Sequence, residues 1–445
     1  MAALLATACG GPSGQGTGND AAMSQGGSGG TATGSGGAAG TTRAAGTTGA
    51  AGTTGVAGTT GAAGTTAFVP AAHPALPQVV DIDRAILRTP KVQLIVYSSD
   101  TGAVDVEAFL QDLTHSSYWA DTTSEYGVGP LTILPTIRLT TAPPATITDT
   151  TLRATLTANT SGANPIWGPA DPSTIYLFAF PPATIESVTG GSCCTDYDGY
   201  HTELTSGATT VPYAVSCACP GFDGPNVTDL QERTIDISHE LVETATDPFP
   251  NVQPGYREED NADIIWSLVS GGEIGDMCEF NDDANFVPPG STYMIQRSWS
   301  NAAAALVQNP CVPHTNSQPY FNSFPALDTI AYAPGGTGFT TQGVNIPIGQ
   351  SKTIAINLFS TAPTGGPWTV RIYDYDQAVV GTSKPYLGLT LDKNTGQNGD
   401  TLHLTIAPKT ADAQLGGEAF IIFSDLGKPG DANFQSNLTM ALVTN

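Results

Sequence analysis

One amphipathic helix predicted at residues 228–248, TDLQERTIDISHELVETATDP, constrains the fold of this chain more than any other stretch. Thr228 and Gln231 have the spacing of a capping box, and Pro248 cannot continue a helix, so both ends are marked. Apolar side chains recur on one face at helical spacing, and they are Leu230, Ile237, Leu241 and Ala245. The pattern predicts a helix whose apolar face packs on a core.

The opposite face of this helix is acidic and carries one histidine. At about 100° per residue, one stripe holds Glu232, Asp236, His239, Glu240, Glu243 and Asp247. His239 and Glu243 are four residues apart, so they project from successive turns as the two histidines of H-E-x-x-H zinc sites do. Glu240 lies beside them, where a general base belongs. The alternative is a solvated acidic face on a helix that only packs.

The charge balance restricts the partners of this protein. Its 445 residues include 40 acidic and 15 basic side chains, which gives a net charge of −25. Such a surface would repel the phosphates of nucleic acids and of anionic lipids, so neither is expected as a partner. An extracellular protein or peptide, or a cell-wall component, is the expected partner.

The first residues predict export and a tether. Residues 1–9, MAALLATAC, resemble the end of a bacterial lipoprotein signal with Cys9 as the acylated residue, and a spare thiol is the alternative. Residues 10–78 are predicted as a disordered Gly/Thr/Ala linker, because the repeated AAGTTG segments lack large side chains that could fill a core. The expected location is the outer membrane or cell surface, or else the extracellular space, with membrane contact only through a lipid on Cys9.

Residues 79–315 are predicted as one α/β domain. Strands are predicted at 91–98, 131–139 and 173–180, and helices at 106–113 and 148–159. This alternation implies a sheet with crossover helices. Residues 322–445 instead show short alternating runs between Gly, Pro and Asn-rich turns, which predicts an all-β, immunoglobulin-like sandwich as an accessory domain.

Six cysteines follow the N-terminal segment, and an even number in an exported chain predicts disulfides. The expected pairing joins Cys193 and Cys194 to Cys217 and Cys219 as a double staple, and Cys278 to Cys311. A cysteine metal site is the alternative, although no C-x-x-C spacing is present.

Three linked motifs in this domain resemble the EXORDIUM-like (phosphate-induced) family. They are HELVETATDP at 239–248, EIGDMCE at 273–279 and YMIQRSWSN at 293–301, before Cys311. Upstream, the paired cysteines before His201 and the run VPYA at 211–214 also resemble that family. The resemblance covers about half of the chain, and it implies an extracellular protein without a settled activity.

The H-E-x-x-E helix of that resemblance also looks zincin-like, which implies a zinc site. Here Glu243 replaces the second histidine, and its charge weakens a zinc ion as a Lewis acid. The first two expected ligands are His239 and Glu243. The candidate third ligands are Glu273, Asp276, Asp247 and His201. Glu273 and Asp276 have an alternative role as turn carboxylates.

Two oxygen-rich loops are candidates for calcium, although solvated acidic loops are the favoured interpretation. These are residues 258–260 with Asp263, and residues 281–283. Neither loop carries the D-x-D-x-D-G ladder of ligands, which favours the solvated interpretation.

Two functions are compatible with these features. The first is an exported, lipid-anchored zinc-dependent hydrolase, peptidase-like, in which Glu240 is the general base. The second is a non-enzymatic cell-surface binding or signalling protein that retains a structural or vestigial metal site.

Overall fold

The computed structural model describes residues 8–9, 67–222, 224, 226–314, 317–333, 338–380, 384–410, 416–431 and 433–445. Apart from Ala8–Cys9, the predicted signal segment lies outside the described residues, as does the predicted linker up to residue 66. The chain forms two compact units, and the described residues from Val69 onward belong to one of them. None of the described helices has the length and apolar character that a membrane span requires.

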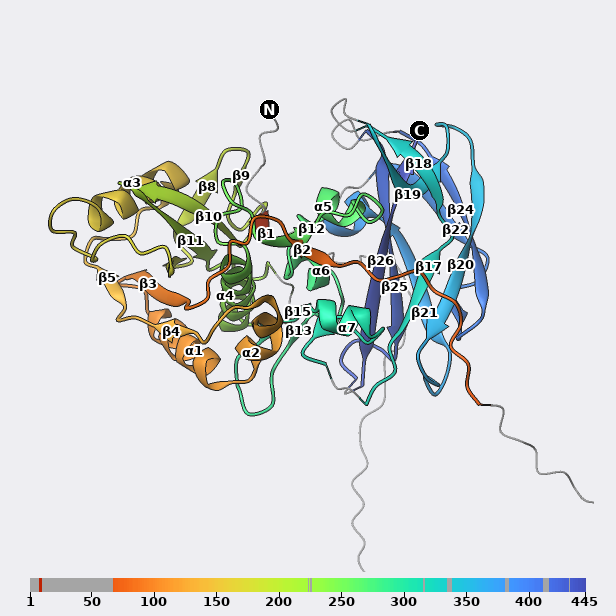
Figure 1. The fold of residues 1–445 in the computed structure, drawn as a ribbon, viewed down its shortest axis with the longest axis horizontal. Coiled ribbons are helices and arrows are strands. Elements are labelled where there is room, and N and C mark those ends of the chain that lie inside the picture. The colour runs from red at the N-terminus through yellow and green to blue at the C-terminus, as the bar shows by residue number, and fades with distance from the viewer. Residues whose placement is uncertain are drawn as a thin grey trace, which may run out of the picture. The chain divides into compact units, whose positions relative to one another are not determined.

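A seven-stranded mixed sheet organises the first half of this unit (Figure 1). Its strand order is β1-β10-β11-β7-β3-β4, with β5 also paired to β3. The bounds are β1 Ala8–Cys9, β3 Lys91–Tyr97, β4 Thr132–Ile133, β5 Ile137–Leu139, β7 Thr174–Phe180, β10 Gly199–Ser206 and β11 Thr209–Cys217. Strands β4, β5, β7 and β11 each pair in parallel with a neighbour, whereas β10 runs antiparallel to β11. The predicted α/β layer is confirmed.

Helices cover both faces of this sheet. The three long ones are α1 Ala103–His115, α3 Asp149–Thr160 and α4 Asp229–Thr246. Leu94 of β3 belongs to the core that includes α1 and α4, whereas its neighbour Ile95 belongs to the core that includes α3. Successive strand residues point to opposite faces, so a central strand needs apolar side chains at every position. That requirement explains the continuous apolar runs of β3 and β7.

One expected strand and one of the family-like motifs are each divided into two short strands in the structure. The strand predicted at 131–139 forms β4 and β5 separately, because Pro135 between them has no backbone N–H to donate to a neighbouring strand. The run at 293–301 likewise forms two short strands, β14 Ile295–Gln296 and β15 Ser298–Trp299.

Short elements complete this half. The strands are β2 Val79–Asp81, β6 Thr146–Thr148, β8 Ile185–Val188, β9 Gly191–Ser192, β12 Tyr256–Glu258, β13 Asn285–Phe286 and β16 Cys311–Val312. The helices are α2 Tyr118–Thr123, a 3-10 turn at Ser124–Tyr126, α5 Ile265–Val269, α6 Asp276–Glu279 and α7 Asn301–Ala305. The small sheets of this half are β2-β12, β13-β14, β15-β16 and the three-stranded β6-β8-β9.

Three disulfides are present, with the expected pairing. They join Cys193 to Cys217, Cys194 to Cys219, and Cys278 to Cys311. The first two lie at the open end of the β10–β11 hairpin. The third connects α6 to β16.

Two sheets that share one core form the second half, as the predicted sandwich requires. The four-stranded sheet contains β17 Phe321–Pro325, β20 Lys352–Ser360, β24 Thr401–Pro408 and β22 Leu387–Leu391. The six-stranded sheet contains β18 Asp328–Tyr332, β19 Phe339–Asn345, β26 Gln435–Thr444, β25 Glu418–Leu426, β21 Trp368–Asp374 and β23 Thr395–Gly396, and a π-helical turn at Asp376–Val380 follows β21. Leu404 of the first sheet and Ile422 of the second belong to one buried cluster. Its immunoglobulin-like character stays a prediction.

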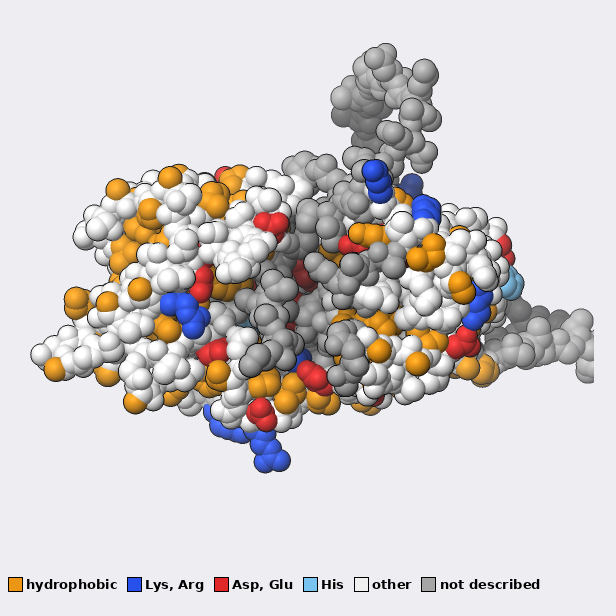
Figure 2. Space-filling view, turned by 90° about the horizontal axis from the view of Figure 1, so that it is seen from above, with side chains coloured by type: hydrophobic (Ala, Val, Ile, Leu, Met, Phe, Trp, Pro, Cys, Tyr) orange, Lys and Arg blue, Asp and Glu red, His pale blue; other side chains and the backbone are white. Residues whose placement is uncertain are grey.

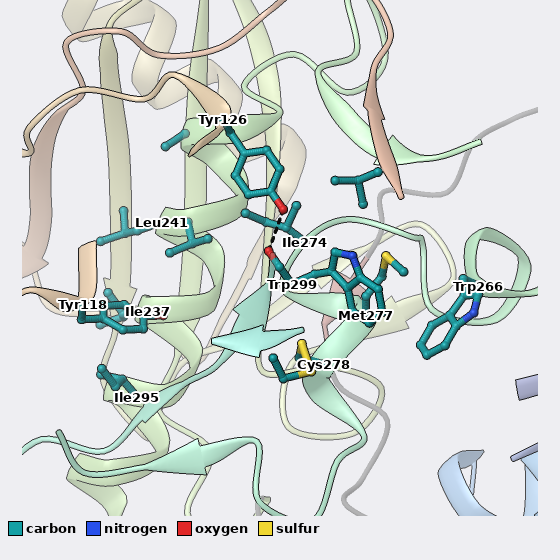
Figure 3. Packing of buried hydrophobic residues seen from close by; sticks show 14 of the residues in the cluster. Tyr118, Tyr126, Ile237, Leu241, Trp266, Ile274, Met277, Cys278, Ile295 and Trp299 are labelled. Carbon is teal, nitrogen blue, oxygen red and sulfur yellow. Dashed lines mark hydrogen bonds between the residues drawn. A yellow bond between two sulfur atoms is a disulfide. The ribbon is translucent and has the colours of Figure 1, made fainter. Parts of the chain in front are cut away.

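The apolar core that includes α1 and α4 continues into the second half. It includes Trp266 and Trp299 as well as Tyr320 and Phe324, and these four side chains line one pocket. Figure 3 shows the part of this cluster around Trp299, whose carbonyl oxygen accepts a hydrogen bond from the hydroxyl of Tyr126. The predicted boundary between residues 315 and 322 stays a prediction, because both halves belong to one compact unit.

Candidate metal centre

Helix α4 begins and ends as its sequence indicates. The Thr228 side chain accepts the Gln231 backbone N–H, and the Gln231 side chain returns to the Thr228 backbone, so both halves of the capping box form. The helix ends at Thr246, with Asp247 as its C-cap directly before Pro248. Every residue from Glu232 to Thr246 is buried. The alternative of a solvated acidic face is therefore wrong, since loops and strands cover that face.

The first ligand set joins α4 to α6. The Nε2 atom of His239 lies 3.0 Å from Oε2 of Glu243 and 3.7 Å from Oδ1 of Asp276. One ligand atom from each of the three residues lies within 4.8 Å of the others, and all three side chains are buried. The expected H-E-x-x-E pair thus has Asp276, one of the candidates, beside it.

The second ligand set joins α4 to the β10 strand and to the loop before α6. It consists of His201, Glu243 and Glu273, again with ligand atoms within 4.8 Å of one another. His201 Nδ1 lies 3.7 Å from Oε2 of Glu243, and His201 Nε2 lies 3.6 Å from Oε2 of Glu273. Antiparallel pairing of β10 with β11 places His201 beside Ala214, on the face of the sheet that α4 covers. His201 and Glu273, which the sequence offered as candidate third ligands, therefore both lie in the cluster.

Glu240 points into the same cluster. Its Oε2 atom lies 3.3 Å from His201 Nδ1, and its Oε1 atom has no hydrogen-bond partner among the described residues. The Glu240 side chain is fully buried. A carboxylate oxygen that is buried without a partner is unusual in a folded protein, and it marks a place where an ion, water or substrate group binds.

Asp247 lies beside the centre and belongs to neither ligand set. Its Oδ1 atom accepts the Gly255 backbone N–H at 2.7 Å, and its Oδ2 atom lies 2.8 Å from Arg257 Nη2. The same guanidinium nitrogen lies 2.8 Å from Oε1 of Glu273. Arg257 therefore positions two carboxylates of the cluster. Sequence reasoning missed Arg257, whose only signal is that it is a lone base in the acidic run REED at 257–260.

Gly275 allows the loop before α6 to approach α4 closely. Its backbone N–H and that of Asp276 donate to Oε1 of Glu243 at 3.1 and 3.0 Å. A Cβ atom at Gly275 would lie 2.7 Å from Oε1 of Glu243 and 3.0 Å from Nε2 of His239. Its backbone is right-handed helical, so space and not conformation requires glycine here. Gln296 holds the loop in place, because its side-chain amide donates to the Gly275 carbonyl at 3.0 Å.

Gly275→Ala is therefore expected to weaken zinc binding although it removes no ligand. The methyl group must displace Glu243 or His239, and disturbance of such supporting groups typically costs about 10- to 100-fold in metal affinity. Competition with a chromogenic chelator measures the affinity. Gly366→Ala is the matched control, because a Cβ atom there meets nothing within 4 Å. Equal affinities for both variants would contradict the assigned role of Gly275.

The electrostatics of the centre favour bound protons. Burial lowers the pKa of His201, but the charges of Glu273, Glu240 and Glu243 outweigh it and raise that pKa to about 10. The pKa of His239 is likewise raised well above its ordinary value, because the Glu243 charge outweighs burial. Burial, together with the charge of Glu243, raises the pKa of Asp276. Protons thus compensate charge in the absence of a cation.

The two loops considered for calcium belong to neither ligand set. In the first loop, Glu258 Oε1 accepts the Asp260 backbone N–H at 2.6 Å. In the second loop, Asp282 lies 2.5 Å from the guanidinium of Arg371. In the described part of the chain, these contacts are those of turn and ion-pair carboxylates. Calcium binding at either loop stays a prediction.

The acidic character of the centre does not extend over the visible surface. Figure 2 shows one face of the molecule, on which acidic and basic side chains are scattered and most side chains are uncharged. The carboxylates of the two ligand sets are at most 3% exposed. The concentration of charge that the helix sequence predicts is therefore internal.

Comparisons with known proteins show a likeness to a solved structure. No protein-family model matches the chain, and no curated protein matches it. One similar solved structure is titled "Crystal structure of the S-layer protein SbsC domains 4 and 5", with 13% sequence identity and a TM-score of 0.16. The match covers 37% of this chain and 93% of that chain. A likeness at this score carries no argument about fold or function.

Proposed function

We propose that this protein is an exported metal-dependent hydrolase, peptidase-like, with its active centre on helix α4. The observation that carries the proposal is the convergence of His239, Glu243 and Asp276, whose ligand atoms lie within 4.8 Å of one another beside Glu240. Imidazole nitrogen and carboxylate oxygen suit zinc, and a partnerless carboxylate oxygen supports a bound group at this point. The residues present therefore fit a zinc ion.

The residues of this centre have distinct roles in such a hydrolase. A bound zinc ion supplies Lewis-acid chemistry. Glu240 accepts a proton from the attacking water at Oε1 and passes it to the leaving amine. His201 lies beside Glu240, with its Nδ1 atom 3.3 Å from the other carboxylate oxygen. Arg257 holds Glu273 in position through the ion pair described above.

A second candidate function is a non-enzymatic cell-surface binding or signalling protein with a structural metal centre. The observation that favours it is burial, because His201, His239 and Glu243 are at most 2% exposed. Structural zinc sites are closed, whereas catalytic sites keep one position open. In this role the ion joins α4, α6 and β10, and the protein binds its partner elsewhere.

The wider context of the proposal comes from the sequence and the disulfides. Three disulfides are consistent with an extracellular or cell-surface protein. We add a lipid anchor on Cys9, an EXORDIUM-like relationship, a zincin-like first domain and an immunoglobulin-like accessory domain as parts of the same proposal. The proposed substrate or partner is an extracellular protein or peptide, or a cell-wall component.

Metal content and proteolysis of a denatured protein substrate test both candidates on the purified full chain. The native protein is expected to hold near-stoichiometric zinc and to cleave the substrate. Glu240→Gln is expected to keep the metal and to lose cleavage by at least about 100-fold, in line with the usual contribution of a general base. Glu107→Gln, on the surface of α1, is the matched control.

The other outcomes assign the function differently. Bound zinc without any cleavage, or cleavage that Glu240→Gln does not reduce, would refute the hydrolase and support the structural centre. Protein that binds no divalent ion, and whose stability chelators leave unchanged, would remove both candidates.

A further inference from the structure

We propose that the centre holds two divalent cations that share Glu243. This inference rests on the proposed function and deepens it. Glu243 belongs to both ligand sets, with His239 and Asp276 in one and His201 and Glu273 in the other. Each set has its own imidazole and its own second carboxylate, so each can hold an ion, and Glu243 is the ligand that the two ions share.

The distances in both sets match those around a bound ion. Ligand atoms of a tetrahedral zinc with bonds of about 2.0–2.1 Å lie about 3.3 Å apart. Oε2 of Glu243 lies 3.0 Å from His239 Nε2 and 3.7 Å from His201 Nδ1. Two backbone N–H groups hold Oε1 of Glu243, which directs Oε2 toward both imidazoles. One carboxylate oxygen therefore lies between two histidines, in the position of a bridging ligand.

The hydrogen bonding of His201 determines which of its ring nitrogens binds the second metal ion. Its Nε2 atom lies 3.2 Å from the backbone carbonyl oxygen of Asp247, which can only accept a hydrogen bond. Such a bond places the proton on Nε2 and directs the lone pair of Nδ1 toward the metal, as second-shell carbonyls do at histidine metal sites. Nδ1 faces Oε2 of Glu243 and Oε2 of Glu240. The second ion therefore belongs beside Nδ1 of His201 and Oε2 of Glu243, while Oε2 of Glu273 lies 3.6 Å from the other ring nitrogen, Nε2.

The charge of the cluster with all carboxylates ionised matches two divalent ions. The buried carboxylates are Glu240, Glu243, Asp247, Glu273 and Asp276. Among the described residues, Arg257 is the guanidinium in contact with them. With both imidazoles as neutral ligands, five carboxylates and one guanidinium leave four negative charges in a buried site. Two divalent cations neutralise four charges, whereas one cation leaves two, which is costly in a low dielectric.

Two buried oxygens provide an independent observation. Oε1 of Glu240 and Oε2 of Glu273 have no hydrogen-bond partner among the described residues, although both side chains are fully buried. Buried polar atoms in folded proteins are nearly always satisfied. Both oxygens belong to residues on the His201 side of Glu243. A single ion in the His239 set would leave Oε2 of Glu273 unsatisfied, and an ion in the His201 set, to which Glu273 belongs, accounts for it.

Zinc stoichiometry of the full chain tests this proposal. The native protein is stripped with a chelator, titrated with zinc in a calorimeter and analysed for metal after desalting. We expect two zinc ions per chain, one ion in His201→Gln and one in His239→Gln, with both ions weakened at least about tenfold in Glu243→Gln. Manganese-loaded native protein should show the exchange-coupled electron paramagnetic resonance spectrum of ions about 3.5–4 Å apart.

The outcomes that would overturn the two-ion centre differ from those that would overturn the proposed function. One zinc ion in native protein, whichever histidine variant then loses it, or an uncoupled manganese spectrum, would overturn the two-ion centre and leave the proposed function intact. No zinc in native protein would overturn both. Since the native stoichiometry and spectrum decide the question, the proposal remains testable even where a variant does not fold.

Discussion

Chelation is expected to lower the midpoint of thermal unfolding by roughly 5 °C for each ion removed. An ion that binds only the folded chain stabilises it by about 2.7 kcal/mol at 100 times its Kd. For a large domain, 1 kcal/mol moves the midpoint by about 2–4 °C. The loss arises because buried carboxylates such as Glu243, Glu273 and Asp276 lose their counter-charge. Calorimetric scans of zinc-loaded and chelated protein measure the difference.

The same comparison has a pH dependence with a defined sign. Burial, with the charge of Glu273, raises the pKa of Asp247 to about 7. Despite burial, the surrounding carboxylates raise the pKa of His201 to about 10. Both pKa values exceed those of the unfolded chain, so the ion-free protein loses stability as the pH rises from about 4 to about 10. Ion binding needs deprotonated ligands and strengthens with pH. The difference in thermal unfolding midpoint between zinc-loaded and chelated protein should therefore widen between about pH 5 and about pH 8.

An exposed carboxylate provides the control. Asp392 pairs with His403 at 2.9 Å on the surface of the second half. Asp392→Asn should leave the gap between loaded and chelated protein unchanged at every pH. A gap in the native protein that is constant or narrows with rising pH would contradict the buried, ion-requiring cluster.

Removal of the Cys278–Cys311 disulfide is expected to destabilise the protein by about 2–4 kcal/mol. This bridge closes a loop of sequence separation 33, so its loss gives the unfolded chain more conformational freedom. It also connects the helix that bears Asp276 to β16, so the ion affinity should fall as well. Denaturant unfolding of the variant with Cys278→Ser and Cys311→Ser measures the stability, and zinc titration measures the affinity.

The double staple is expected to act mainly on the other ligand set. The disulfides Cys193–Cys217 and Cys194–Cys219 hold the open end of the hairpin that carries His201. Their reduction should weaken zinc binding through His201 while the His239 set keeps its ligands. Alkylation of native protein without reductant, followed by mass spectrometry, should find all six of these thiols blocked. Several free thiols would refute the pairing.

Local sequence signals predicted where helices and strands lie better than they predicted what surrounds each of them. The capping box of Thr228 and the stop at Pro248 marked α4 correctly, because both act within a few residues. The acidic face of that helix is buried, which its sequence does not reveal, because amphipathicity distinguishes two faces but not what covers them. The elements that cover it include β10, with His201, and the segment that carries Glu273 and Asp276.

The remaining residues of the centre could not be assigned from the sequence, because they are brought together by contacts between distant parts of the chain. His239 and Glu243 are recognisable because four residues fix their relative position in a helix. His201 and Asp276 lie 42 and 33 positions from Glu243 along the chain, on each side, and only the folded sheet and loops bring them together. The close approach at Gly275 and the ion pairs of Arg257 leave no periodic pattern, so neither could be found by spacing.

The apolar cluster that joins both halves limits how this protein can be divided or recombined in evolution. Trp266 and Trp299 share a lined pocket with Tyr320 and Phe324, so a cut between them would expose aromatic surface on both pieces. A domain that can be exchanged between proteins needs a polar contact surface with its neighbour. The contact surface at this junction is aromatic. The sandwich should therefore be inherited together with the sheet domain, and exchange for an unrelated sandwich would require a matched change on the α5 side.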